Sequence, residues 1–388
     1  MTLATFKNTG RGMMATSDIA AGEVIVRVPK SFLISNDALY KIYGPHSLST
    51  HQLLALHLVL LLQDSNCWWK PYLDLLPSHF NTLPVTFPPT LSSHLPDGLK
   101  NEVELQRQKI KSDYLAAVQF LKTKKTLMEP SSLSSKQYEW AWLCVNTRCI
   151  HVTTSDNTAK GGNIAMAPLL DFLNHTSEAR IESGFNPQTQ SFEIKTLIPY
   201  RKGEQVFINY GPHDNQAIFR EYGFVLPQNE YNFVSLDKEV WSLFEDIEPS
   251  EKARSTKRWI LKNSGYEGDY TVKTGDISFR LLCALRLLAI KGSEGGTFQR
   301  SVMAWQDVIM GQSDQIDDTN ERTMYHMLKS ICTNALAHSE NKRSGLNNLA
   351  KSSIHHPFAL LFLRQIWNES CDILQDTLHD IDTRLTTL

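Results

Sequence analysis

The sequence lacks an excess of charge of either sign and any apolar run long enough to cross a membrane. Its 388 residues carry a formal net charge of -2, so there is no electrostatic argument for binding nucleic acid or an anionic membrane surface. The longest apolar run, Leu53 to Leu62, is interrupted by a histidine and is too short to span a bilayer. We therefore expect neither nucleic acid nor a membrane as a partner. The apolar run predicts a buried helix.

Paired cysteines and metal-ligand spacings are also missing. The six cysteines include no CxxC pair, and the N-terminus has no apolar signal core, which together favour reduced thiols in the cytoplasm or the nucleus. No cluster of histidines and carboxylates has the spacing of a metal site. We expect no metal.

The pattern of the chain changes along its length. A length of 388 residues predicts more than one domain. Strand-like alternation predicts strands at about 1–35 and 165–235, whereas helical periodicity predicts helices at about 47–150 and after 236. We predict a first domain at 1–235 with a helical insertion at about 40–160, and a helical second domain at 236–388. The insertion separates two strand-rich halves that we expect to rejoin in one sheet system.

Two local patterns predict further details. Gly22-Glu23 and Gly203-Glu204 each precede an alternating strand, which predicts two similar turns in the β domain. Asp318 and Glu321 have the spacing of a capping box, which predicts the start of a helix there.

Four stretches carry polar residues in places that call for an explanation, namely "NTGRGMMA", "WAWLCVNTRCIHV", "MAPLLDFLNHTSEAR" and "VFINYGPHDNQAIFREYGFV". Taken singly, each has an ordinary interpretation. The glycines suit a tight turn as well as a ligand loop. Arg148 lies in an apolar helix and needs an anion, which is either a structural carboxylate or that of a ligand. The pair Asn174-His175 suits a satisfied turn, and Tyr210 suits a core position.

Taken in order, these stretches resemble the SET-domain protein lysine methyltransferases of the Rubisco large-subunit methyltransferase type. The resemblance covers nearly the whole chain and rests on "WWKPYLDLLP", "WAWLCVNTR", "LLDFLNH", "GPHDNQ" and "EYGFV". It implies an α+β SET fold, in which small twisted β-sheets form a pseudoknot, with a helical insertion and an all-α C-terminal substrate-binding domain. It also implies S-adenosyl-L-methionine as cofactor and a lysine of a histone or another protein as substrate.

The resemblance also implies roles for individual residues. Tyr210 matches the catalytic tyrosine. The positions that match the cofactor site are Gly10, Arg11, Gly12, Arg148, Asn174, His175, Tyr210 and Phe224. The positions that match the lysine site are Asp171, Ile150, Phe192, Ile208 and Tyr222. Relatives carry an aromatic residue at the place of Ile150 and a tyrosine at that of Phe192, so the substrate and the degree of methylation stay open.

The reaction explains why such residue types are required. A free lysine has a pKa of about 10.4, and methyl transfer needs its neutral amine. An apolar aromatic channel disfavours the ammonium by desolvation, so Tyr210 is better suited to orient the amine than to act as a strong base. Two alternatives remain open: a SET-fold protein that binds lysine peptides or partners without turnover, and a C-terminal helical block that dimerises rather than binds substrate.

Overall fold

The computed structural model describes four stretches of the chain, residues 1–124, 126–152, 164–349 and 354–388. Internal contacts divide the chain into two compact units, Met1–Asn229 and Glu230–Leu388. The domain boundary predicted near residue 236 falls just inside the second unit.

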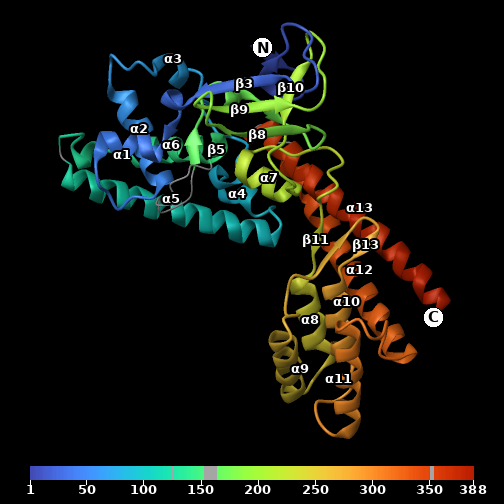
Figure 1. Cartoon of the computed structure of the whole chain (residues 1–388). Coiled ribbons are helices and arrows are strands. Elements are labelled where there is room, and N and C mark those ends of the chain that lie inside the picture. The colour runs from blue at the N-terminus through green and yellow to red at the C-terminus, as the bar shows by residue number, and fades with distance from the viewer. Residues whose placement is uncertain (125, 153–163, 350–353) are drawn as a thin grey trace. The chain divides into compact units, whose positions relative to one another are not determined.

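The first unit combines short strands with a block of helices (Figure 1). Its strands are β1 (Thr2–Phe6), β2 (Gly10–Met14), β3 (Val24–Pro29), β4 (Ile34–Ser35), β5 (Cys149–His151), β6 (Ile164–Met166), β7 (Asn174–His175), β8 (Ile181–Asn186), β9 (Ser191–Thr196) and β10 (Gln205–Ile208). Its helices are α1 (Asn36–Tyr43), α2 (Thr50–Gln63), α3 (Lys70–Leu73), α4 (Pro89–Ser92), α5 (Asp97–Thr123), α6 (Ser135–Arg148) and α7 (Asn215–Tyr222), and a short 3-10 turn, η4 (Leu170–Phe172), precedes β7.

The two strand-rich halves rejoin across the helices, as predicted, but in separate sheets rather than in one. The described strands of this unit pair in the orders β1-β2-β10-β7, β3-β9-β8 and β4-β6-β5. Each sheet joins a strand that precedes the helices to one that follows them. Strands of two to six residues give each sheet little area, so the core lies between the sheets and the helices rather than on one broad sheet face.

The two Gly-Glu turns are confirmed. Gly22 has φ 92° and Gly203 has φ 90°, the left-handed region that glycine adopts without strain. In each turn the glutamate accepts a hydrogen bond from a backbone N–H three residues earlier: Glu23 from Ala20 at 3.1 Å and Glu204 from Arg201 at 2.8 Å. The same local chemistry therefore precedes β3 and β10.

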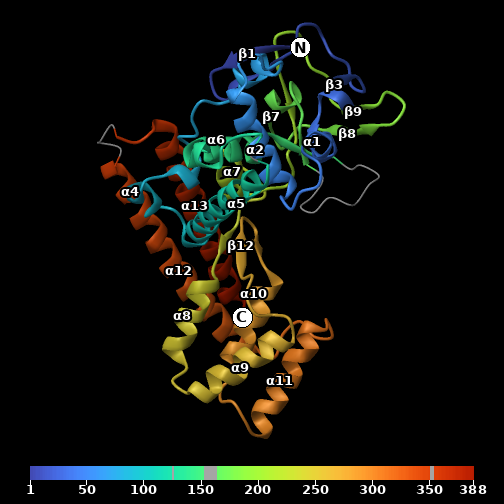
Figure 2. The same ribbon diagram turned by 90° about the vertical axis from the view of Figure 1, so that its left-hand side faces the viewer.

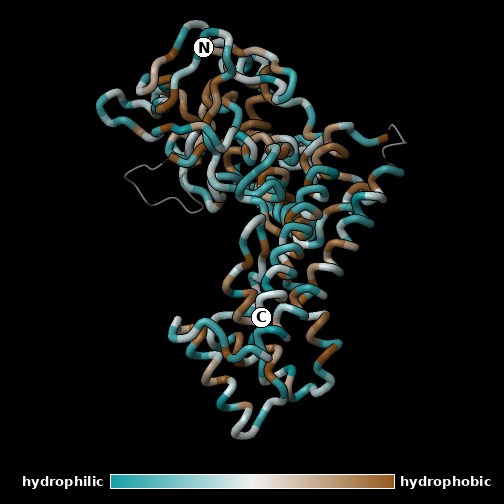
Figure 3. Tube along the Cα trace, turned by 90° about the vertical axis from the view of Figure 1, so that its right-hand side faces the viewer, coloured by the Kyte–Doolittle hydropathy of each residue, from teal (hydrophilic) through white to brown (hydrophobic). Residues whose placement is uncertain are grey.

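The apolar run that predicts a buried helix forms α2. Ser49 and Gln52 close a capping box at its start, and Leu53, Leu54 and Leu56 are fully buried. α2 packs against α6, α5 and α1 (Figure 2). In Figure 3 the hydrophobic parts of the trace gather in the interior of this unit. Many of the buried core residues belong to α2 and α6.

The second unit is mainly helical, as predicted, and adds a small sheet in the order β11-β12-β13. Its elements are β11 (Val234–Ser235), α8 (Asp237–Ile247), α9 (Glu251–Asn263), β12 (Thr271–Lys273), β13 (Asp276–Ile277), α10 (Phe279–Ala289), α11 (Gly296–Ile309), α12 (Asp318–Leu349) and α13 (Pro357–Thr387). Its core holds the fully buried Trp305, whose Nε1 donates to the carbonyl of Cys283 at 2.7 Å.

The helix predicted from the capping-box pattern is present as α12, but the predicted cap is wrong. Asp317 rather than Asp318 caps the helix, because its Oδ1 accepts from the backbone N–H of Asn320 at 2.8 Å. Glu321 instead forms a bidentate pair with Arg286, with both N–O distances 2.7 Å. A buried carboxylate gains more from a bidentate guanidinium than from one backbone N–H. None of the described helices is both long and apolar enough to cross a membrane.

Candidate active site

Segments that lie far apart in the sequence meet at β10. This strand pairs antiparallel with β2 and parallel with β7. The parallel register sets Ile208 opposite His175, and Tyr210 lies two residues after the end of the strand. Backbone pairing therefore brings together the glycine turn (Gly10–Gly12), the Asn174-His175 pair and the segment of Tyr210. We call this meeting of β2, β10 and β7 the crossing.

The glycine turn leaves room for an amide at this crossing. Asn174 Nδ2 donates to the carbonyl of Arg11 at 2.9 Å. A Cβ at Gly12 would stand 2.8 Å from Asn174 Nδ2 and would also collide with the amide of Gln205. Gly10 has φ 68°, a conformation that favours glycine. A side chain at Gly12 would therefore have to displace the amides of Gln205 and Asn174, and the backbone conformation at Gly10 favours glycine.

His175 and Tyr210 fix each other. The backbone N–H of Tyr210 donates to His175 Nδ1 at 3.0 Å, and the two rings stack with centroids 4.9 Å apart. Burial lowers the pKa of His175, which keeps the imidazole neutral and its Nδ1 an acceptor. The hydroxyl of Tyr210 donates to the carbonyl of Leu173 at 2.8 Å, and burial raises its pKa well above the usual value of about 10. Tyr210 thus presents a protonated, oriented hydroxyl.

Two more aromatic rings complete a cluster around Tyr210. Tyr222 lies at the end of α7 with its ring centroid 4.8 Å from that of Tyr210. Gly223 then ends the helix with φ 77°, and the chain turns so that Phe224 lies 6.3 Å from His175 and 6.2 Å from Tyr222. We call His175, Tyr210, Tyr222 and Phe224 the ring cluster.

The anion that Arg148 binds in the structure is the side chain of Asp171. Arg148 Nη1 donates to both the carbonyl and the Oδ2 of Asp171, each at 3.0 Å, and the guanidinium lies 5.1 Å from the ring of Phe172. The Asp171 side chain is fully buried, and Tyr72 donates to the same Oδ2 at 2.9 Å. Burial raises the pKa of Asp171, while Arg148 opposes that shift. The sequence left open whether Arg148 binds a structural carboxylate or that of a ligand, and the structure shows a structural carboxylate.

A family model described as the SET domain matches residues 10–211, which is more than half of the chain. The chain belongs to the SET-domain family. A second model, described as the ribosomal lysine N-methyltransferase 2 C-terminal domain, matches residues 232–380. The two matches fall within the two units of the structure.

Relatives of the SET family resemble the chain over nearly its whole length. SET domain-containing protein 4 of Homo sapiens is 32% identical over 99% of this chain and 88% of its own. Ribosomal lysine N-methyltransferase set11 of Schizosaccharomyces pombe is 27% identical over 93% of this chain and 88% of its own. A crystal structure described as the SET domain of LSMT bound to lysine and AdoHcy has a TM-score of 0.65 and 17% identity, covering 99% of this chain and 86% of that chain. The predicted SET fold is confirmed.

The structure gathers most, but not all, of the residues matched to the SET family. Ile208 lies beside His175 through strand pairing. Ile150 belongs to β5, next to the end of α6. Phe192 lies in β9 opposite Phe185, in another sheet, and none of its described contacts reaches the ring cluster. Asp171, matched to the lysine site, is joined to Arg148 in one buried ion pair. The individual roles stay predictions.

Two polar residues at the site were missed from the sequence. Tyr72 binds Asp171, and Asn146 Nδ2 donates to the carboxylate and the carbonyl of Glu221 at 2.8 and 3.3 Å. Both lie in stretches that carry the family resemblance, "WWKPYLDLLP" and "WAWLCVNTR", and a polar group in an otherwise apolar segment is the signal that indicates them. Within the described part of the chain, no three His, Cys, Asp or Glu side chains group as a metal site requires.

Proposed function

We propose that the chain is an S-adenosylmethionine-dependent protein-lysine N-methyltransferase. The observation that carries the proposal is the crossing of β10 with β2 and β7, which sets Asn174 against the glycine turn and stacks His175 on Tyr210. Membership of the SET family supports it, as does similarity to a relative named as a ribosomal lysine N-methyltransferase.

The residues at the crossing fit the cofactor. No described residue donates a hydrogen bond to Oδ1 of Asn174, and Nε of Arg148 is buried without a partner among the described residues. An open acceptor and an open donor suit the amino-acid part of a ligand, and Phe224 offers an aromatic face for a base. We assign the Gly10–Gly12 loop, Arg148, Asn174, His175 and Phe224 to cofactor binding. S-adenosylmethionine supplies a methyl group activated on a positive sulfur.

The ring cluster suits the lysine. The rings of Tyr210, Tyr222 and Phe224 lie within 6.5 Å of one another, and an aromatic wall disfavours the ammonium form of an entering lysine by desolvation. The Tyr210 hydroxyl keeps its proton, because burial raises its pKa, so it orients the amine rather than removing a proton from it. Positioning contributes most of the rate enhancement, since the leaving group is already activated.

The substrate is proposed as a lysine of a histone or a non-histone protein, reached in the cytoplasm or the nucleus. The second unit, matched to a lysine methyltransferase C-terminal domain, is proposed as the platform that binds this protein. The net charge of -2 supports a protein partner rather than nucleic acid or a membrane.

The alternative is a SET-fold protein that binds lysine peptides without turnover. The test incubates the full chain with isotopically labelled S-adenosylmethionine and a protein lysate, and locates the label by mass spectrometry. Label on lysine side chains supports the proposal. Label on another side chain corrects the substrate class, and tight cofactor binding without any transfer favours the binding protein.

A further inference from the structure

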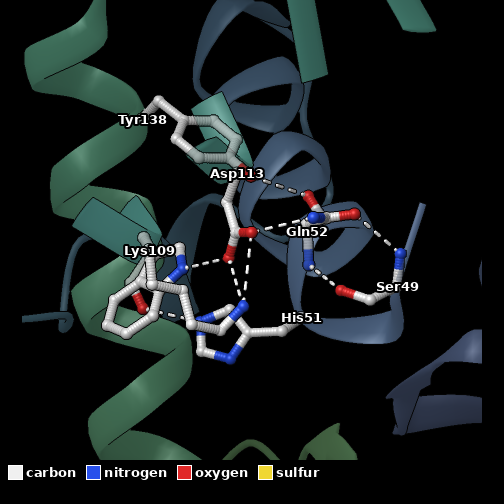
Figure 4. A network of polar contacts seen from close by, with 7 residues as sticks. Ser49, His51, Gln52, Lys109, Asp113 and Tyr138 are labelled. Atoms are coloured by element: carbon white, nitrogen blue, oxygen red, sulfur yellow. Dashed lines mark hydrogen bonds and ion pairs between the residues drawn. The ribbon is translucent and has the colours of Figure 1, made fainter. Parts of the chain in front are cut away.

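A buried carboxylate outside the ring cluster ties three helices of the first unit together. Asp113 of α5 is 2% exposed, and donors from α2, α5 and α6 converge on it (Figure 4). Gln52 Nε2 donates to Oδ1 at 2.8 Å, Trp142 Nε1 donates to Oδ2 at 2.9 Å, and Lys109 Nζ lies 3.0 Å from Oδ2. A buried carboxylate is costly unless it is paired and hydrogen-bonded, and Asp113 is both.

The same network holds α6 through Trp142 from two directions. The indole N–H is bound by Asp113, while the carbonyl of Trp142 accepts from His51 Nε2 at 3.2 Å. The rings of His51 and Trp142 lie 4.4 Å apart. Burial lowers the pKa of His51 to about 4, so the ring is neutral at pH 7 and its single hydrogen lies on Nε2. Gln52 is itself held by the capping box of α2. These contacts restrain α6 against both rotation and sliding.

From Trp142, α6 runs on to the candidate site. Arg148 is its last residue, and six residues of helix rise about 9 Å. Arg148 binds Asp171, and Asn146 binds the carboxylate and the carbonyl of Glu221 at the end of α7. One helix thus holds both the segment that precedes the Asn-His pair and the helix end that carries part of the ring cluster.

We propose that Asp113 is a positioning residue for the site: by fixing Trp142 it fixes α6, and α6 sets Arg148 and Asn146. The inference rests on the proposed methyltransferase function. Among the described residues, Asp113 contacts none of those assigned to cofactor or lysine, so it acts through Trp142.

Two full-length variants test this role. Asp113→Asn removes the charge and one acceptor at nearly unchanged volume, and Trp142→Phe removes only the indole N–H and part of the ring. We expect either change to raise the dissociation constant of S-adenosylmethionine about tenfold and to lower kcat/KM by about ten- to a hundredfold, as a displacement of positioned groups does. Calorimetric titration and steady-state kinetics are measured well below the melting temperature. If Asp113→Asn fails to fold, the affinity and the kinetics of Trp142→Phe test the positioning role instead, because this variant leaves Asp113 bound to Gln52 and Lys109.

A matched control separates positioning from stability. Glu321→Gln weakens a buried ion pair with Arg286 in the second unit and should lower the melting temperature while leaving the affinity for S-adenosylmethionine unchanged. Wild-type protein that binds no S-adenosylmethionine overturns the proposed function. The positioning role alone is overturned if the wild-type protein binds S-adenosylmethionine and both Asp113→Asn and Trp142→Phe bind it as tightly, at lower melting temperatures.

Discussion

Replacing Tyr210 by phenylalanine tests the proposed chemistry most directly, because it removes one hydroxyl and keeps the ring. The ring stack on His175 at 4.9 Å and the contact with Tyr222 at 4.8 Å do not need the hydroxyl. The hydrogen bond from the hydroxyl to the carbonyl of Leu173, 2.8 Å long, is lost. One such bond contributes about 1 kcal/mol, so the first unit should melt about 2–4 °C lower.

Turnover should change far more than stability. The Tyr210 hydroxyl is aimed by Leu173 and keeps its proton because burial raises its pKa. If it aligns the lysine amine with the methyl group, its loss should lower kcat by about two to three orders of magnitude, the scale of losing one preorganised polar contact. Affinity for S-adenosylmethionine should change little, since the hydroxyl binds the chain's own carbonyl.

Tyr200→Phe is the matched control for this experiment. Its hydroxyl donates to the carbonyl of Phe207 and accepts from the N–H of the same residue, each at 3.3 Å, and none of its described contacts reaches the ring cluster. It should lower the melting temperature by a similar amount and leave turnover unchanged. Kcat, cofactor affinity and melting temperature are measured on the same preparations. A cooler melt with unchanged turnover in Tyr210→Phe would remove Tyr210 from the mechanism.

Three further predictions concern the site, the second unit and pH. Asn174→Ala should abolish S-adenosylmethionine binding in calorimetric titration while the chain stays folded; wild-type affinity would refute the assignment. Glu321→Ala leaves Arg286 buried without its partner and should lower the free energy of unfolding by about 3–5 kcal/mol in denaturant titrations; a loss below about 1 kcal/mol, as for exposed pairs, would contradict this. Burial lowers the pKa of His57 to about 4. The unfolded chain therefore takes up this proton first, so His57 should contribute about 3 kcal/mol of stability that is present above pH 6.5 and is lost towards pH 4. His57→Gln should make the loss of stability between pH 6.5 and pH 4 smaller by this amount and leave the part due to His51, whose pKa burial also lowers to about 4. An equal loss in both proteins would exclude His57 as a contributor.

The fold could be predicted from the sequence as far as local patterns and the family resemblance reach. The Gly-Glu turns depend on glycine φ and on a glutamate three residues away, so they are visible in the sequence. The division into separate sheets is not, because β2 and β10 are too short to carry a strong pattern and their pairing joins segments about 190 residues apart. The capping box predicted at Asp318 was wrong for a related reason. Glu321 binds Arg286 instead, and no local sequence pattern indicates that pair.

Most of the residues that meet at the candidate site could be singled out from the sequence, but not all of their pairings could. An arginine in an apolar helix predicts an anion, and Arg148 has one. The sequence could not say that the anion is Asp171, since both residues also match separate family roles. Only the folded chain shows that Arg148, Asp171 and Tyr72 form one buried group.

The fold explains why Asn174 and His175 follow directly after a buried apolar run. At this place β7 pairs with β10, and the pair binds backbone groups of two other segments, the carbonyl of Arg11 and the N–H of Tyr210. An apolar pair would lose both hydrogen bonds, each contributing about 1 kcal/mol. The same side chains hold the crossing and lie beside the ring cluster. Changes at Asn174 and His175 therefore act on the crossing and the proposed cofactor site together, whereas Tyr210→Phe acts on one hydroxyl.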